Sequence, residues 1–201
     1  MSNREPFQLK RPLLLWNTFL AVFSFFGFIR TAEKYKASFI KADFIYGTLI
    51  SDNMVELGDT YFIVLKKKPL TFLHCYHHIV VLIGTIHGGA AHSAHGRFFI
   101  TMNYFVHCIM YSYFAYTSYG WRPSRSMSML VTTLQIAQML IGITINSLVH
   151  QIKLYETAPC QQTMGHVYLG YFIYGSFAAL FIHFYINAYY LSPRSKHRKT
   201  E

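Results

Sequence analysis

Six apolar stretches run along this chain of 201 residues, and each is about long enough to cross a bilayer as a helix. A helix of ~20 residues spans the ~30 Å hydrocarbon core of a membrane. Hydrophobic residues make up 53% of the sequence and charged residues only 13%, a balance typical of membrane proteins. We therefore predict an all-α, multi-pass transmembrane helical bundle. Its six spans are expected at residues 13–29, 44–65, 70–86, 98–119, 127–149 and 167–191.

The net charge of +10 does not indicate nucleic-acid binding, because the basic residues lie between the apolar stretches rather than on one soluble face. The positive-inside rule explains them better. With both termini in the cytosol, 12 of the 18 Lys and Arg residues fall on the cytosolic side. We expect one membrane domain over residues 1–201, ending in a basic cytosolic tail at 192–201. The tail's last four residues resemble a dibasic retrieval signal for the endoplasmic reticulum.

The segment 73–78, Leu-His-Cys-Tyr-His-His, places three imidazoles inside the third apolar stretch. Their spacing of i, i+3 and i+4 puts all three on one face of a helix. Ionisable side chains at membrane depth are costly unless they line a wet or protein-filled interior, so such a cluster indicates a functional site. His74, His77 and His78 are therefore candidate catalytic residues.

Other polar residues fall at a similar depth in the predicted bundle. Counting the ~1.5 Å rise per helical residue from the nearest basic residue on the cytosolic side places His77 about 14 Å deep. The same count puts polar groups of four further spans at about 10 to 18 Å, near the middle of the hydrocarbon core. A chamber shared by five spans is the simplest explanation. These groups are Glu56, Asp59, His107, Gln135 and His183, with Asn103, Gln138 and Asn187 at helical spacing beside them.

Several of these residues also have a purely structural interpretation. Amide side chains often link membrane helices by hydrogen bonds, so the four Asn and Gln residues fit that role as well as a site role. His183 by itself fits a packing histidine better than a site residue. Tyr111 can line the chamber or belong to an aromatic belt near the membrane interface.

The motifs around these residues resemble those of the fatty acid elongases, the membrane condensing enzymes of very-long-chain fatty acid synthesis. The resemblance runs from about Lys10 to the C-terminus. It is closest to the subgroup that extends saturated and monounsaturated chains, palmitate in particular, because Pro69 stands where the polyunsaturated-specific subgroup carries Gln. The motifs are at residues 56–60, 62–65, 74–78, 102–107, 110–113 and 132–138.

Three features depart from the family pattern. Asn53 stands where the acidic motif opens with Lys, and Phe114 replaces the second residue of the usual Tyr pair. We also predict six spans where the family has seven, and the missing span is the first. The connection at residues 31–43 is short as well. A shortened active enzyme and an inactive truncated paralogue both stay open.

The resemblance implies a very-long-chain 3-oxoacyl-CoA synthase, an acyltransferase without a cofactor. It would join a long-chain acyl-CoA with malonyl-CoA to give a 3-ketoacyl-CoA, CoA and CO2. The implied partners are these two substrates, membrane lipid and the other enzymes of the elongation cycle, with a homodimer as an open alternative. The implied location is the endoplasmic reticulum membrane, with the C-terminus in the cytosol.

We hypothesise that an imidazole handles the acyl group, either as a covalent nucleophile or as a base. His77 is our choice for the acyl acceptor, and His107 would assist on the malonyl side. Carboxylates commonly orient imidazoles, and amides donate to thioester or enolate oxygens. No metal site is predicted. The expected supporting residues are Glu56, Asp59, Asn103, Tyr111 and Gln135.

The two ends of such a substrate also need places. Basic residues at the cytosolic mouth are candidates to bind the phosphates of CoA, although the same residues would be basic merely to fix topology. The acyl tail would enter an apolar tunnel toward the opposite leaflet. The candidate phosphate ligands are Lys66, Lys67, Lys68, Arg122 and Arg125.

Two other classes of function compete with this interpretation. Membrane di-iron desaturases and hydroxylases also use an HxxHH box, but they need several boxes to hold two metals, and this chain has one. A transporter or channel would use the polar layer as a binding site or proton relay. Against that class, the sequence shows no repeated halves and no pair of spans broken by Gly or Pro.

Overall fold

The computed structural model describes residues 7, 9–33, 55–90, 96–155 and 163–191, and these fold into helices joined by short turns. No strand occurs in this described part, so the predicted all-α helical fold is confirmed. Residues 55–65 are helical and precede α3. The labelled helices are α1 (Lys10–Glu33), α3 (Phe72–Ala90), α4 (Gly96–Tyr119), α5 (Arg125–Leu154) and α6 (Met164–Ile186), which continues as the π-helix η1 (Asn187–Leu191).

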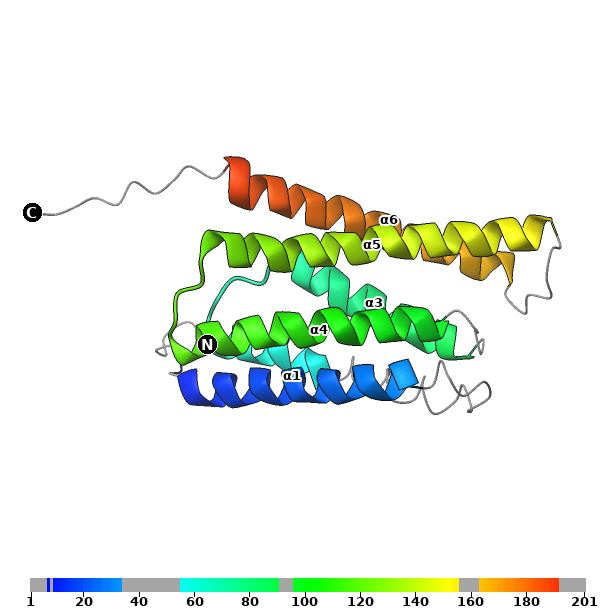
Figure 1. The fold of residues 1–201 in the computed structure, drawn as a ribbon. Coiled ribbons are helices and arrows are strands. Elements are labelled where there is room, and N and C mark those ends of the chain that lie inside the picture. The colour runs from blue at the N-terminus through cyan, green and yellow to red at the C-terminus, as the bar shows by residue number, and fades with distance from the viewer. Residues whose placement is uncertain (1–6, 8, 34–54, 91–95, 156–162, 192–201) are drawn as a thin grey trace, which may run out of the picture.

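The helices pack as two antiparallel pairs (Figure 1). α1 lies along α4, and their contact buries Leu20 and Tyr111. α5 lies along α6, where Met139 and Phe177 form the centre of a second apolar cluster. α3 contacts α6 and adds Tyr76 and neighbouring apolar side chains to that cluster. The polar face of α3 is thereby held inside the bundle.

Local contacts bring the starts and ends of several helices to one end of the bundle. The backbone N–H of Phe7 donates to the carbonyl of Leu65 at 3.4 Å, and the ammonium of Lys10 lies beside Gly120 after α4. Gly120 has a φ of +115°, a conformation that favours glycine, and turns the chain toward α5. Ser124 then caps α5 by accepting from the backbone N–H of Met127. This end corresponds to the predicted cytosolic side.

Among the described residues, three helices are long and apolar enough to cross a membrane: Lys10–Glu33, Arg125–Leu154 and Met164–Leu191. The apolar stretch Phe72–His87 in α3 is shorter. Large apolar side chains such as Leu15, Phe26 and Phe172 are exposed on the outer faces, as expected of helices that face lipid. The count of six spans stays a prediction. Residues 44–54 of the second predicted span, Asn53 among them, and the predicted tail 192–201 lie outside the described residues.

The α5–α6 contact gives a test of this packing. A Cβ atom at Gly142 would lie 2.5 Å from Cδ1 of the Tyr174 ring, whereas a Cβ atom at Gly175 would meet nothing within 4 Å. Gly142→Ala is expected to cost about 1 to 3 kcal/mol by forcing the ring out of place. Gly175→Ala should be neutral or gain up to about 1 kcal/mol from helix propensity.

Thermal unfolding in detergent, followed by size-exclusion chromatography, measures both variants against wild type. A lower midpoint for Gly142→Ala alone is the expected result. Equal midpoints for the two variants would contradict the close approach of α5 and α6.

Candidate active site

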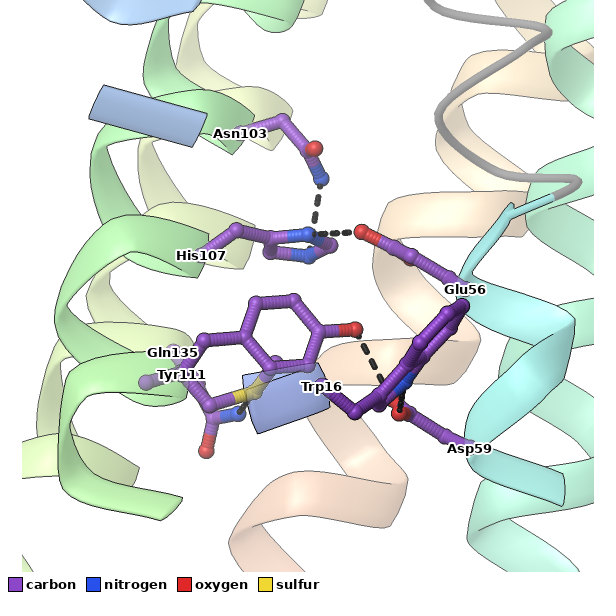
Figure 2. Close-up of polar contacts among 8 residues, drawn as sticks. Trp16, Glu56, Asp59, Asn103, His107, Tyr111 and Gln135 are labelled. Carbon is purple, nitrogen blue, oxygen red and sulfur yellow. Dashed lines mark hydrogen bonds and ion pairs between the residues drawn. The ribbon is translucent and has the colours of Figure 1, made fainter. Parts of the chain in front are cut away.

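His107 is held between a carboxylate and an amide inside the bundle (Figure 2). Its Nδ1 is hydrogen-bonded to the carboxylate of Glu56, and its Nε2 lies 3.3 Å from the amide nitrogen of Asn103. Glu56 is 1% exposed and His107 is 5% exposed. Because an amide nitrogen only donates, Nε2 accepts and Nδ1 carries the proton. Glu56 therefore fixes the ring tautomer that keeps a lone pair on Nε2.

Asp59 joins three helical segments one turn below this pair. The Tyr111 hydroxyl on α4 donates to one of its oxygens at 2.8 Å, and the Trp16 indole N–H on α1 donates to the other at 2.7 Å (Figure 2). The Trp16 ring lies directly on Gly58, where a Cβ atom would be 2.3 Å away. Sequence reasoning missed Trp16. An indole N–H in an apolar stretch needs an acceptor, and that requirement was the available signal.

The three histidines of α3 all face the same interior space. His74 Nε2 lies 2.9 Å from the Thr60 hydroxyl, and the rings of His74 and His78 are 4.3 Å apart. His77 lies against Phe177, with ring centroids 5.0 Å apart. Its Nδ1 is buried and has no hydrogen-bond partner in the described part of the chain. A ligand that enters beside His77 would supply the missing partner.

These side chains line a cavity of about 370 Å³, which we call the chamber. Five segments contribute to it: residues 55–65, α3, α4, α5 and α6 with its η1 extension. Gln135 also reaches it, and its amide donates to Met110 Sδ at 3.2 Å (Figure 2). The structure thus brings together all nine predicted catalytic and supporting residues: Glu56, Asp59, His74, His77, His78, Asn103, His107, Tyr111 and Gln135.

A second cavity of about 170 Å³ adjoins the chamber. Its walls are mostly apolar and include Val80, Val81, Ile100 and Ile173. We call it the tail cavity. Four residues line both cavities and form their shared boundary, which we call the neck: His77, Asn103, Gln138 and Met139.

The five predicted phosphate ligands are not among the residues that line either cavity. Lys66 is half-buried, and desolvation followed by the nearby charge of Lys68 lowers its pKa. Arg125 is exposed and donates to the backbone carbonyl of Tyr189, which itself lines the chamber. Arg125 therefore lies beside the chamber's edge. The other three, Lys67, Lys68 and Arg122, are exposed.

His183 does not line the chamber although it lies at a similar depth, which agrees with the interpretation that it is not a site residue. It is exposed on α6, and its Nε2 lies 2.8 Å from the Asn187 amide nitrogen on the same helix. Depth along a helix gives no information on the direction in which a side chain points. Phe184, the next residue, lines the chamber instead.

The arrangement is suited to proton transfer and acyl transfer. It offers an oriented imidazole with a basic nitrogen at His107, an unpartnered imidazole nitrogen at His77, and amides that can bond a carbonyl oxygen. Within the described residues, no three His, Cys, Asp or Glu side chains are grouped so as to hold a metal ion.

Comparison with known proteins gives one consistent result. The sequence model of the GNS1/SUR4 family matches residues 1–198. "Putative fatty acid elongase 4" of Caenorhabditis elegans is 44% identical over an alignment covering 100% of this chain and 75% of the relative. "Very long chain fatty acid elongase 6" of Drosophila melanogaster is 39% identical, with 99% and 69% covered. The Homo sapiens protein of the same name is 38% identical, with 94% and 77% covered.

The match to the family extends over nearly the whole described structure and over every motif that lines the chamber. Together with three helices apolar enough to cross a bilayer, it identifies an integral membrane protein of fatty acid elongation. The chain belongs to the GNS1/SUR4 family of fatty acid elongases.

Proposed function

We propose that this chain is the condensing enzyme of fatty acid elongation, a very-long-chain 3-oxoacyl-CoA synthase. It joins a long-chain acyl-CoA with malonyl-CoA and releases CoA and CO2. The observation that carries this proposal is the position of His77, which lines both a polar chamber and a mostly apolar cavity and has a buried, unpartnered Nδ1. A long-chain acyl-CoA also has a polar part, at the thioester and CoA, and an apolar part, the acyl tail.

The substrate fits the two cavities by polarity. An acyl tail is stabilised by apolar walls, so it occupies the tail cavity beside Val81 and Ile173. The malonyl group and the end of the CoA arm occupy the chamber, where hydrogen-bonding groups are concentrated. The thioester carbon then lies at the neck, next to His77.

The first step is acyl transfer to His77. Its nitrogen lone pair attacks the thioester carbon, the C–S bond breaks, and CoA leaves as a thiolate that takes up a proton. The product is an acyl-imidazole whose tail stays in the tail cavity. His74 and His78 flank the same face of α3 and keep the site polar.

The second step is condensation. Malonyl-CoA loses CO2, and the electron pair of the broken C–C bond forms an enolate that attacks the acyl carbon. The C–N bond to His77 breaks and the 3-ketoacyl-CoA forms, while the departing ring nitrogen takes up one proton from water, which returns the neutral imidazole. His107, whose ring is held by Glu56 and Asn103, assists on the malonyl side.

The proposal also includes the binding of CoA, the location in the membrane and the partners. CoA phosphates bind the basic residues at the end of the bundle that carries Lys66 and Arg125. In this proposal that end of the bundle faces the cytosol, as does the C-terminus. The enzyme lies in the endoplasmic reticulum membrane. It works beside the other enzymes of the elongation cycle, either alone or as a homodimer.

Transfer of label from radioactive malonyl-CoA tests the reaction directly. Membranes that contain the wild-type chain and palmitoyl-CoA should form labelled 3-ketoacyl product. His77→Ala should lower the rate by about 10³-fold or more, because it removes the acyl acceptor. His183→Ala is the matched control, since that imidazole is exposed and lines neither cavity.

Abundant, folded wild-type protein that forms no labelled product would refute the condensing function for this chain. Product formation that survives in His77→Ala would instead remove His77 from the role of acyl acceptor.

Glu56→Gln tests the orientation of His107. The neutral amide keeps the size of the side chain but no longer stabilises the Nδ1-protonated ring, so kcat should fall by about 10²-fold or more. The KM for palmitoyl-CoA should change little, because Glu56 is not expected to touch the acyl chain. A large rise in KM with an unchanged kcat would contradict this role.

Val81→Phe tests the tail cavity. The larger ring should occupy the space of the acyl chain and lower kcat/KM for palmitoyl-CoA about tenfold or more relative to lauroyl-CoA. Ile83→Phe is the control, because Ile83 is 60% exposed on the outer face of the same helix. Product analysis with both primers would count against this placement if the two variants showed the same chain-length preference.

A further inference from the structure

The neck holds three polar side chains, and their hydrogen bonds differ. Asn103 uses its amide nitrogen on His107, and its Oδ1 is buried with no partner in the described part of the chain. His77 has an unpartnered Nδ1. Gln138 is only 6% exposed and lines both cavities, and no side-chain hydrogen bond holds its amide within the described residues.

An unbonded amide at such a depth is costly. Burying an amide without a partner loses the hydrogen bonds that it makes with water, so buried amides in proteins are nearly always bonded. Amides that link membrane helices meet a partner on the neighbouring helix. Gln138 meets none in the described part of the structure, and its amide atoms are not among the fully buried atoms that lack a partner, so they border the cavity space. Water can bond this amide in the empty cavity, and a ligand at the neck would take the place of that water.

Gln135, one turn earlier on α5, provides a comparison. Its amide donates to Met110 Sδ, and it lines the chamber but not the tail cavity. Gln138 therefore differs from Gln135 both in lacking a protein partner and in reaching the boundary between the cavities. In the proposed binding mode, the acyl tail meets the thioester at the neck, and Gln138 lies there.

The thioester carbonyl oxygen needs a donor at this place. It accepts hydrogen bonds, and negative charge develops on it when a nucleophile adds to the carbonyl carbon. The amide nitrogen of Asn103 already donates to His107, and this bond fixes the direction of its second N–H. The Nδ1 of His77 must keep its lone pair in order to attack. The amide of Gln138 has no protein partner within the described residues, so it is the donor at the neck that is free to turn toward the carbonyl oxygen.

We propose that the side-chain amide of Gln138 donates a hydrogen bond to the carbonyl oxygen of the acyl group at the neck. This inference rests on the proposed function and extends it by assigning the group that binds the reacting oxygen. The bond strengthens as charge develops on that oxygen, so Gln138 acts on the rate of acyl transfer more than on the binding of the tail.

Two inert analogues of palmitoyl-CoA test the bond. In one, CH2 replaces the thioester sulfur and the carbonyl is retained. The other is S-hexadecyl-CoA, a thioether without a carbonyl. Displacement of radiolabelled S-hexadecyl-CoA measures the affinity of each analogue without turnover, because this thioether has no acyl group to transfer to His77. Wild type should bind the ketone analogue about threefold to tenfold more tightly than the thioether, the range expected for one hydrogen bond.

Gln138→Met keeps a similar size but removes the donor, so the ratio of the two affinities should fall to about one. In the labelled malonyl-CoA assay, kcat should fall about 10²-fold to 10³-fold, with a much smaller change in KM. Leu140→Ala is the control, because Leu140 is 50% exposed on the same helix. It should keep both the ratio and kcat.

Gln138→Leu serves as a second donor-free variant if Gln138→Met does not elute as folded protein in size-exclusion chromatography. A wild-type ratio in a folded Gln138 variant, or a kcat within about twofold of wild type, would overturn the proposal. Wild-type protein that shows the ratio but forms no 3-ketoacyl product would instead refute the condensing function and leave the carbonyl contact standing.

Discussion

The buried hydrogen bond between Glu56 and His107 is the contact on which the rest of the interior depends. A carboxylate in a low-dielectric interior is costly unless it is paired and hydrogen-bonded. Residues 55–65 must therefore stay close to α4, and the second carboxylate, Asp59, reinforces this position through Tyr111 and Trp16. The apolar α1–α4 contact then closes the outside of the same region. Apolar packing and hydrogen bonds therefore both hold residues 55–65 in the same position beside α1 and α4.

In soluble proteins most polar side chains face outward and most apolar side chains face inward. This bundle shows the reverse arrangement. Polar side chains concentrate in the chamber, while large apolar side chains face outward, where lipid is expected. The tail cavity is a mostly apolar space that shares four lining residues with the chamber. An amphipathic ligand is consequently held in one orientation, with its junction at the neck.

Much of the site was predictable from sequence because helical spacing is regular. The i, i+3, i+4 pattern of His74, His77 and His78 and the common depth of five segments identified the chamber. Spacing and depth do not give the direction of a side chain around its helix axis. His183 lies at the depth of the chamber but points outward, and the contact of Trp16 with Asp59 across helices was missed. Hydrogen-bond partners between distant segments follow from packing, which the sequence pattern does not encode.

Asn103, His107 and Tyr111 lie on α4 at every fourth residue, and each meets a different polar partner or space along one face. A helix advances about 100° per residue, so an inserted or deleted residue between 103 and 111 would rotate part of this set out of the chamber. The eight-residue interval therefore has to keep its length for the chamber to keep its lining. A single substitution in this interval changes one contact, whereas a change in length would displace several contacts at once.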